Sequence, residues 1–354
     1  MSAFRVLDAH VFGRHVLIEP VAEVSNAENI LRPALRIALS NGVQMPQVGL
    51  GSNTRRLEYT LPNDNAVSTA LDAGYRLIDT AEVYGNETPI GEVLHDQFSA
   101  GKLKRDDVFV TTKCWRSHLR PGETVPACRE SLRQLQLDYV DLYLAHMPTA
   151  GKLDPEKGET VHDPTVSVED IWRALEEVYD AGLARAIGVS NFSLAQMERI
   201  VKIARVPVHN LQVECHIYFP QHELHDFCKR HNITFTAYAP LGSPGRKAVV
   251  PRGQSTASWP DAPNPFEDDD VIALTKKYGK TPAQILLRQL VQRGIAVIPK
   301  SVNEARIKEN LAIDDFELTK EEVDKLAHPG KVQRLFMQTF QAGHPEDPYK
   351  SERS

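Results

Sequence analysis

This sequence of 354 residues lacks several features that would place a chain in a specialised class. Its four cysteines, Cys114, Cys128, Cys215 and Cys228, are widely spaced and form no CxxC pair, which indicates reduced thiols. No apolar run approaches the roughly 20 residues that are needed to cross a bilayer. A net charge of −6 argues against a general nucleic-acid binder, which would be basic. We therefore expect no membrane, nucleic acid or metal as a partner.

The N-terminal segment carries no strong targeting signal. Asp8 interrupts it and no continuous apolar stretch is present, so it makes a poor secretory signal. Arg5 and Arg14 leave a mitochondrial presequence conceivable, but Glu19 soon follows them. We expect residues 1–34 to form an extension, partly ordered or flexible, of a cytoplasmic protein.

Beyond this segment, short apolar runs alternate with segments of helical periodicity. Eight such runs occur, at residues 47–51, 75–80, 107–113, 140–146, 184–191, 211–216, 234–240 and 295–301. Near-continuous apolar strands that alternate with helices predict a parallel sheet covered by helices. Eight of them are the number that a (β/α)₈ TIM barrel requires, which we assign to residues 35–354. A doubly wound sheet is the alternative, and it is less favoured because no GxGxxG follows the first strand.

Two helices have readable boundaries. Ser167 is placed to cap the first helix, and Gly182 stands where that helix should stop. Thr281 is placed to cap the second, with Pro282 at its first position and Gly294 at its end. Both segments fit the outer layer of a barrel.

Other segments depart from this rhythm. The dipeptide Asn41-Gly42 between apolar flanks predicts an N-terminal β-hairpin, which would close the bottom of the barrel. Residues 147–167 and 242–267 read as long loops, of the kind that form lids or binding loops. The tail, residues 342–354, either covers the site or is frayed; we expect it to cover the site.

The predicted strands end in polar residues. In chain order these are Asp79, Lys113, His146, Asn191, Gln212, Tyr238 and Lys300. Active sites of such barrels lie at the carboxyl ends of the strands. One isolated His or Lys there is usually a structural residue, but seven on the same face favour a functional site.

Four residues form a plausible acid–base group. A lysine ammonium beside a carboxylate is held in place, and near a phenol it favours the phenolate. Asp79 and Lys113 would thus tune Tyr84, whose unperturbed pKa near ~10 is too high for an efficient acid at neutral pH. His146 would supply a donor that orients a carbonyl oxygen.

These residues carry a resemblance to the aldo-keto reductases, over about residues 35 to 354. The stretch GYRLIDTAEVYGNE resembles the first signature of the family. The spacings from Tyr84 to Lys113 and from Lys113 to His146 fit its Asp-Tyr-Lys-His tetrad, which begins with Asp79. This resemblance implies that the four residues are catalytic.

The resemblance also implies a set of cofactor-binding residues for NADPH. Ser190, Asn191 and Gln212 would hold the nicotinamide carboxamide, Tyr238 would stack on the ring, and Gly51, Ser52, Leu241 and Ser243 would complete the site. Lys300, Ser301 and Arg306 would bind the 2′-phosphate, with Glu309 and Asn310 on the adenine. Two cations beside a helix start are also what a phosphate requires, although a solvated charged face is the alternative.

The chain departs from the family pattern in its expected substrate pocket. Met147 follows the histidine where the family often has Trp, and Asn53 replaces another common Trp, whereas Trp115 is retained. We therefore expect an aromatic-poor pocket. Gly245 stands where many members carry an Asp that closes a loop over the cofactor by pairing at the position of Lys300.

The sequence thus predicts NADPH-dependent reduction of a small-molecule aldehyde or ketone, with Tyr84 as proton donor, by a monomer or weak dimer. His146 favours C=O over C=C reduction, because relatives that reduce C=C bonds carry Glu there. A Schiff-base lyase that uses Lys113 and a non-catalytic NADPH-binding barrel, acting as a sensor or partner subunit, remain as alternatives.

Overall fold

A computed structural model describes residues 35–53, 66–154, 156, 159–246 and 259–353. The expected N-terminal extension, residues 1–34, lies outside the described residues. In the described part, no helix is both long and apolar enough to span a bilayer.

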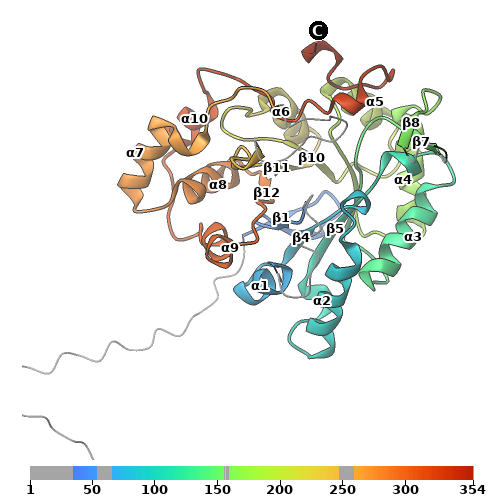
Figure 1. Cartoon of the computed structure of the whole chain (residues 1–354), viewed down its shortest axis with the longest axis horizontal. Helices are drawn as coiled ribbons and strands as arrows, with labels where there is room; N and C mark the ends of the chain where they lie inside the picture. The colour runs from blue at the N-terminus through green and yellow to red at the C-terminus, as the bar shows by residue number, and fades with distance from the viewer. Residues whose placement is uncertain (1–34, 54–65, 155, 157–158, 247–258, 354) are drawn as a thin grey trace, which may run out of the picture. The chain divides into compact units, whose positions relative to one another are not determined.

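Eight parallel strands form the barrel (Figure 1). They are β3 (Leu50–Gly51), β4 (Leu77–Asp79), β5 (Phe109–Cys114), β6 (Leu142–Ala145), β9 (Ile187–Ser190), β10 (Asn210–Glu214), β11 (Thr234–Tyr238) and β12 (Ala296–Val297). The barrel closes between its first and last strands, where Val48 pairs with Val297 in parallel and Gly49 N–H donates to the Val297 carbonyl at 2.9 Å. The predicted (β/α)₈ barrel is confirmed.

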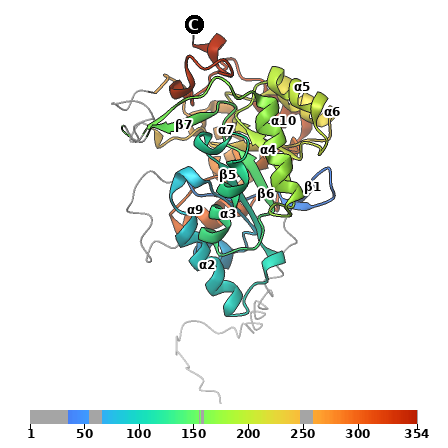
Figure 2. The same cartoon turned by 90° about the vertical axis from the view of Figure 1, so that its right-hand side faces the viewer.

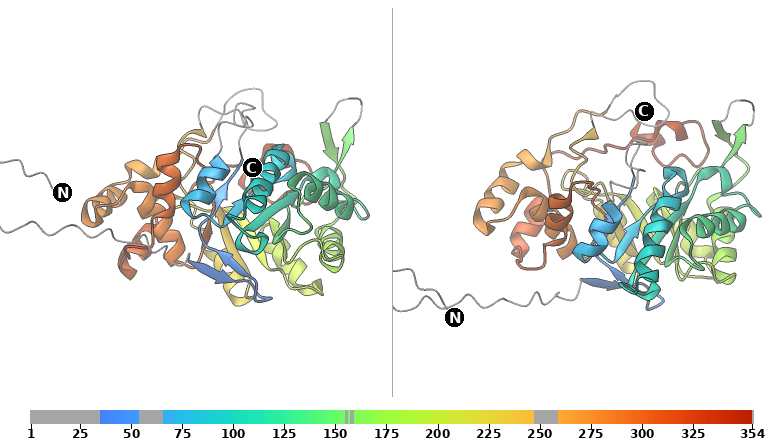
Figure 3. Two further views of the ribbon diagram at one scale, coloured as in Figure 1. Left: turned by 90° about the horizontal axis from the view of Figure 1, so that it is seen from below. Right: turned by 60° about the horizontal axis from the view of Figure 1, so that its bottom comes forward.

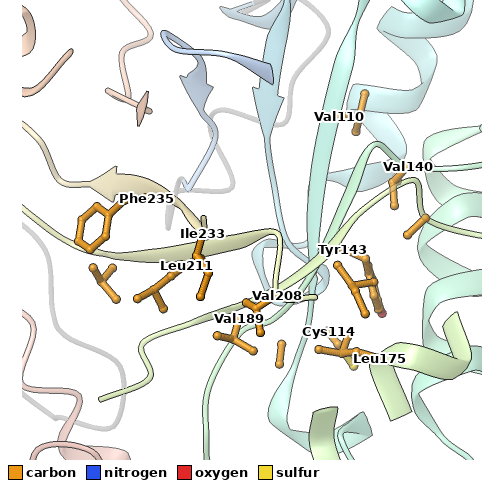
Figure 4. Close-up of a cluster of buried hydrophobic side chains, with 14 of the residues drawn as sticks. Val110, Cys114, Val140, Tyr143, Leu175, Val189, Val208, Leu211, Ile233 and Phe235 are labelled. Atoms are coloured by element: carbon orange, nitrogen blue, oxygen red, sulfur yellow. The ribbon is translucent and has the colours of Figure 1, made fainter. Parts of the chain in front are cut away.

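Side chains alternate between the two faces of each strand, as the period of two requires. Leu77, Phe109 and Leu142 belong to a cluster inside the barrel. Val110 and Tyr143, one residue further along their strands, pack in the larger cluster that includes residues of the surrounding helices (Figure 4). Both faces are therefore buried, which explains why these strands read as continuous apolar runs.

The predicted N-terminal hairpin is present. It consists of β1 (Arg36–Ala38) and β2 (Gln44–Pro46) around the turn that contains Asn41 and Gly42. Gly42 has φ 85°, a backbone conformation that favours glycine. Leu39 and Met45 of the hairpin complete the interior cluster, so the hairpin covers the end of the barrel opposite the C-terminal tail (Figure 3).

Ten α-helices surround the sheet among the described residues. They are α1 (Ala66–Ala73), α2 (Glu87–Ser99), α3 (Thr124–Leu135), α4 (Val168–Asp180), α5 (Leu194–Ile203), α6 (His222–Arg230), α7 (Asp269–Tyr278), α8 (Pro282–Gln292), α9 (Glu304–Leu311) and α10 (Lys320–Ala327). Ser167 and Thr281 cap α4 and α8 by accepting hydrogen bonds from Asp170 N–H and Gln284 N–H, so both predicted helix starts are confirmed.

Residues 147–167, expected to be a loop, contain a second hairpin. It is formed by β7 (Gly151–Asp154) and β8 (Glu159–His162), which pair antiparallel. Figure 2 shows β7 at the same end of the molecule as the C-terminal tail. The strands are short and rich in charged residues, so they lack the apolar alternation that would have revealed them. The expectation of a loop was therefore incomplete.

The chain after α10, residues 328–353 and from here on called the tail, lies across the end of the barrel where the strands finish (Figure 1). The buried carboxylate of Glu214, at the end of β10, accepts hydrogen bonds from the N–H groups of Leu335 and Phe336 at 2.6 and 2.9 Å. Further along, the Arg199 guanidinium bridges Glu346 of the tail and Glu169 of α4. Charged and main-chain groups therefore anchor the tail to the barrel at separate points.

Candidate active site

The expected site residues lie on the inward-facing rows of the strands. Asp79 is two residues beyond Leu77, and Lys113 is four beyond Phe109, so both continue the face that lines the barrel interior. His146 likewise follows Leu144 by two residues. The alternation that fills the lower barrel with apolar side chains therefore gathers these polar groups at its mouth.

A buried ion pair joins the first two residues. Lys113 Nζ donates to Asp79 Oδ1 at 2.6 Å and to the carbonyl of Thr80 at 2.9 Å. Burial lowers the pKa of Lys113, and the nearby charge of Asp79 opposes that shift. Asp79 thus helps to keep Lys113 charged, whereas burial alone would favour the neutral amine.

Tyr84 and His146 complete the group of four. Tyr84 ends a short 3₁₀ turn, η2 (Glu82–Tyr84), and Gly85 follows it with φ 68°. The Tyr84 ring lies 5.6 Å from the His146 ring, edge to face, and 5.2 Å from Lys113 Nζ. The structure therefore brings together all four residues that the sequence predicted as a tetrad.

A second polar group adjoins the tetrad through Asp79. Gln212 Nε2 donates to Asp79 Oδ2 at 2.8 Å, so each oxygen of this carboxylate has a donor. Asn191, which has φ 66°, donates from Nδ2 to the His146 carbonyl at 2.9 Å and to Ser190 Oγ at 3.0 Å. These links between the tetrad and the expected nicotinamide residues involve distant strands and were not foreseen from the sequence.

Asn191 also contacts Tyr238 and the tail. Its Oδ1 accepts from Tyr238 OH at 2.8 Å, from Gln338 Nε2 at 2.8 Å and from Tyr349 OH at 3.3 Å. Gln338 and Tyr349 were not among the predicted site residues. The tail carries no periodic pattern that would have placed them there.

The expected phosphate residues lie just before and in the first turn of α9, and the expected adenine residues lie in its last turn. Lys300 and Arg306 are exposed, Ser301 and Glu309 are half-buried, and Asn310 is buried. Asn303 caps the helix by accepting from Arg306 N–H at 3.0 Å. Thr281 Oγ1 donates to Glu309 Oε1 at 2.6 Å, so part of that carboxylate already has a partner. Lys300 lies before α9 and Arg306 in its first turn, and the phosphate site stays a prediction.

The remaining expected cofactor residues lie in two places. Some are at the junction of β3 and β12, from here on called the barrel seam, and the others follow β11. Gly51 lies so close to β12 that an added Cβ would meet the Ile298 carbonyl oxygen at 2.6 Å. Ser52 is held by Asn86, whose Nδ2 donates to the Ser52 carbonyl at 2.8 Å. Leu241 and Ser243 belong to the turn after β11. Part of the expected loop at residues 242–267, namely residues 247–258, lies outside the described residues.

One aromatic residue beside the expected substrate pocket was not considered from the sequence. Met147 is buried and Asn53 is exposed, whereas Trp115 lies edge to face with His146 at 5.2 Å. The Phe340 ring, from the tail, lies 5.8 Å from the Trp115 ring. The tail therefore adds one aromatic ring against Trp115, which the expectation of an aromatic-poor pocket did not include.

A further missed residue connects the loops on either side of the site. Glu82, in the turn that carries Tyr84, accepts from Trp115 N–H at 2.9 Å and pairs with His118 Nδ1 at 2.7 Å. The hydrogen bond that His118 makes to the Glu82 carboxylate raises the pKa of His118 despite its partial burial. Glu82 thereby fixes the turn of Tyr84 against the loop of Trp115.

The fold and the site together define a barrel enzyme with an acid–base group at the mouth of its strands. The family model for the aldo/keto reductase family matches residues 47–328, and the chain belongs to this family. The expectation of an oxidoreductase is thereby confirmed.

Relatives agree along almost their whole length. The chain is 41% identical to aldo-keto reductase family 1 member A1-A of Danio rerio over 331 residues, which cover 88% of this chain and 98% of that protein. It is 40% identical to dihydrodiol dehydrogenase 3 of Bos taurus, over 90% of this chain and 98% of that protein.

Two solved structures are similar in fold. The aldose reductase of Schistosoma japonicum matches with a TM-score of 0.78 and 36% identity, over 90% of this chain and 99% of that one. An aldo-keto reductase complexed with NADPH matches with the same TM-score and 33% identity, over 90% and 94% of the two chains.

Proposed function

We propose that this protein reduces aldehydes or ketones to alcohols with NADPH, and that Tyr84 donates the proton to the carbonyl oxygen. The observation that carries this proposal is the convergence of Tyr84, His146 and the buried Asp79–Lys113 ion pair at the carboxyl ends of adjoining strands. The family assignment and the NADPH complex of a relative support it.

The residues present fit the cofactor. Lys300 and Arg306 are exposed beside the start of α9, where two cations and a helix N-terminus favour a phosphate. At the other end, Ser190, Asn191 and Gln212 offer hydroxyl and amide groups suited to a carboxamide. When bound, NADPH would supply the hydride that adds to the carbonyl carbon.

The tetrad residues would act on the carbonyl oxygen. His146 would donate a hydrogen bond that orients this oxygen, and Tyr84 would transfer its phenolic proton to it. Lys113 lies where its positive charge would stabilise the phenolate that remains. Asp79 would hold the Lys113 ammonium in this position through its 2.6 Å hydrogen bond.

The test is turnover of a reactive aldehyde by Tyr84→Phe. This change removes one oxygen and keeps the ring, so we expect normal folding and NADPH affinity but a kcat lower by about 10²–10⁴-fold, the usual contribution of a positioned acid. Tyr139→Phe is the matched control, because the Tyr139 hydroxyl donates to Asp106 at an exposed position. Turnover and cofactor fluorescence quenching would be measured for all three proteins.

Near-normal turnover in Tyr84→Phe would refute the proposed acid. If the natural protein bound NADPH but reduced no member of a panel of aldehydes, ketones, sugars and quinones, a binding role would replace the catalytic one. The proposal is supported if the natural protein reduces members of the panel and Tyr139→Phe is as active as the natural protein.

A further inference from the structure

We propose that Gln338 of the tail competes with the nicotinamide carboxamide for Asn191, and so sets the affinity of the protein for NADPH. This inference rests on the proposed function, because it takes Asn191 as a nicotinamide-binding residue. Gln338 itself carries a primary carboxamide, the same chemical group that the nicotinamide ring carries. Two primary carboxamides, one on Gln338 and one on the nicotinamide, would therefore compete for Asn191.

The hydrogen-bonding capacity of the Asn191 side chain is fully used. Its two N–H groups go to the His146 carbonyl and Ser190 Oγ. Its oxygen has two lone pairs but three donors, from Tyr238, Gln338 and Tyr349. A carboxamide that binds to Asn191 must therefore replace one of these partners.

Gln338 is the partner best placed to leave. The His146 carbonyl and Ser190 belong to the barrel itself, and the Tyr349 ring is buried with the Arg334 guanidinium 3.9 Å from its centre. Gln338, in contrast, has φ 44° and ψ 53°, a left-handed conformation that is unfavourable for a residue with a side chain.

The Gln338 amide is the outer member of a chain of side-chain hydrogen bonds. Its Oε1 accepts from Gln341 Nε2 at 3.0 Å, and Gln341 Oε1 accepts from Thr149 Oγ1 at 2.8 Å. Gln341 and Thr149 are both fully buried. Gln338 Nε2 additionally lies 3.3 Å from Tyr238 OH, so the same amide contacts two residues expected to hold the nicotinamide. These hydrogen bonds point the Gln338 amide toward Asn191 and Tyr238.

The test compares the affinity of two ligands for variants of the full chain. Gln338→Ala should lower the Kd for NADPH by about three- to tenfold, which is the usual worth of one net hydrogen bond. The Kd for 2′-phospho-adenosine diphosphoribose, which lacks the nicotinamide, should not change. A general effect on folding would move both values together. Gln333→Ala is the matched control, since the Gln333 side chain donates to the Arg334 carbonyl and takes no part in the Asn191 contacts.

Two further variants separate a failure of the competition from a failure of the nicotinamide assignment. Gln338→Met keeps the length of the side chain without its amide, and should tighten NADPH binding as Gln338→Ala does. Asn191→Ala should weaken NADPH binding. If Asn191→Ala weakens binding while both Gln338 variants bind NADPH unchanged or more weakly, competition is overturned and the proposed function stands. If Asn191→Ala binds NADPH normally, the nicotinamide assignment itself fails.

Discussion

Two lysines show how the environment of a single residue decides its role. Lys113 is buried, and desolvation lowers its pKa although Asp79 pairs with it. Lys300 is exposed beside the start of α9, where it meets no such cost and can attract an anion from solvent. The same side chain therefore suits proton chemistry at one strand end and phosphate binding at another.

Lys300→Met should reduce the preference for NADPH over NADH. A charge-assisted hydrogen bond to the 2′-phosphate is worth about 1.5–3 kcal/mol, so NADPH should bind the natural protein at least about tenfold more tightly than NADH. The variant should lose most of this difference through weaker NADPH binding. Isothermal titration with both cofactors measures it.

The control for this change is Lys308→Met, on the same helix. Lys308 pairs with Glu304 one turn away and is exposed, so its removal should leave both affinities nearly unchanged. Equal affinity of the natural protein for the two cofactors would contradict the phosphate assignment.

At the scale of elements, short connecting turns hold the site together. The turn that carries Tyr84 and the loop that carries Trp115 meet through Glu82, whose carboxylate contacts the Trp115 N–H and the His118 ring. Both segments are short: η2 has 3 residues, and so does the 3₁₀ turn Arg116–His118 that follows Trp115. Their geometry therefore depends on contacts such as those of Glu82. The contact between them therefore depends in part on the charge of His118.

The contribution of His118 to stability should depend on pH. The hydrogen bond with Glu82 raises the folded-state pKa of His118 above the unfolded value of about 6.5. Its stabilising contribution is thus fully present below about pH 6.5 and is lost as pH rises through the folded-state pKa. The difference in melting temperature between the natural protein and His118→Gln should shrink accordingly from acidic to mildly alkaline pH.

His95→Gln is the matched control for this series. His95 is an exposed histidine of α2 that lies 3.3 Å from the Ser99 hydroxyl. The difference for this variant should stay nearly constant. A constant difference for His118→Gln as well would show that the pair with Glu82 contributes no pH-dependent stability.

The sequence predicted the elements whose signals are local. Burial on both faces makes the barrel strands continuous apolar runs, and Ser167 and Thr281 mark helix starts within a few residues. Asp79, Lys113 and His146 were predictable because they lie at or next to the ends of successive strands, and Tyr84 follows in the turn after the first of these. In contrast, the contacts of Gln338 with Asn191 and of Phe340 with Trp115 span more than a hundred residues. They depend on the path of the tail, which no local pattern encodes.

At the scale of the whole molecule, the barrel seam joins the first strand to the last and also carries residues that are expected to bind the cofactor. The strands on either side, β3 and β12, have only 2 residues each. Few hydrogen bonds therefore join the first strand to the last; one runs from Gly51 N–H to the Pro299 carbonyl at 3.2 Å. Gly51 on one side and Lys300 on the other are both expected cofactor residues. Damage to the seam should thus affect folding and NADPH binding together.

Gly51→Ala tests this coupling. The new methyl group would meet the Ile298 carbonyl oxygen, a backbone atom, at 2.6 Å, so β3 and β12 must move apart. Overpacking of this kind costs about 1–3 kcal/mol, which chemical denaturation would measure. NADPH affinity should fall in parallel. Gly330→Ala is the control: its added methyl group meets no atom within 4 Å, and its stability should change by less than about 0.5 kcal/mol. If Gly51→Ala were as stable as Gly330→Ala and bound NADPH normally, the seam would have to be more adjustable than its close contacts imply.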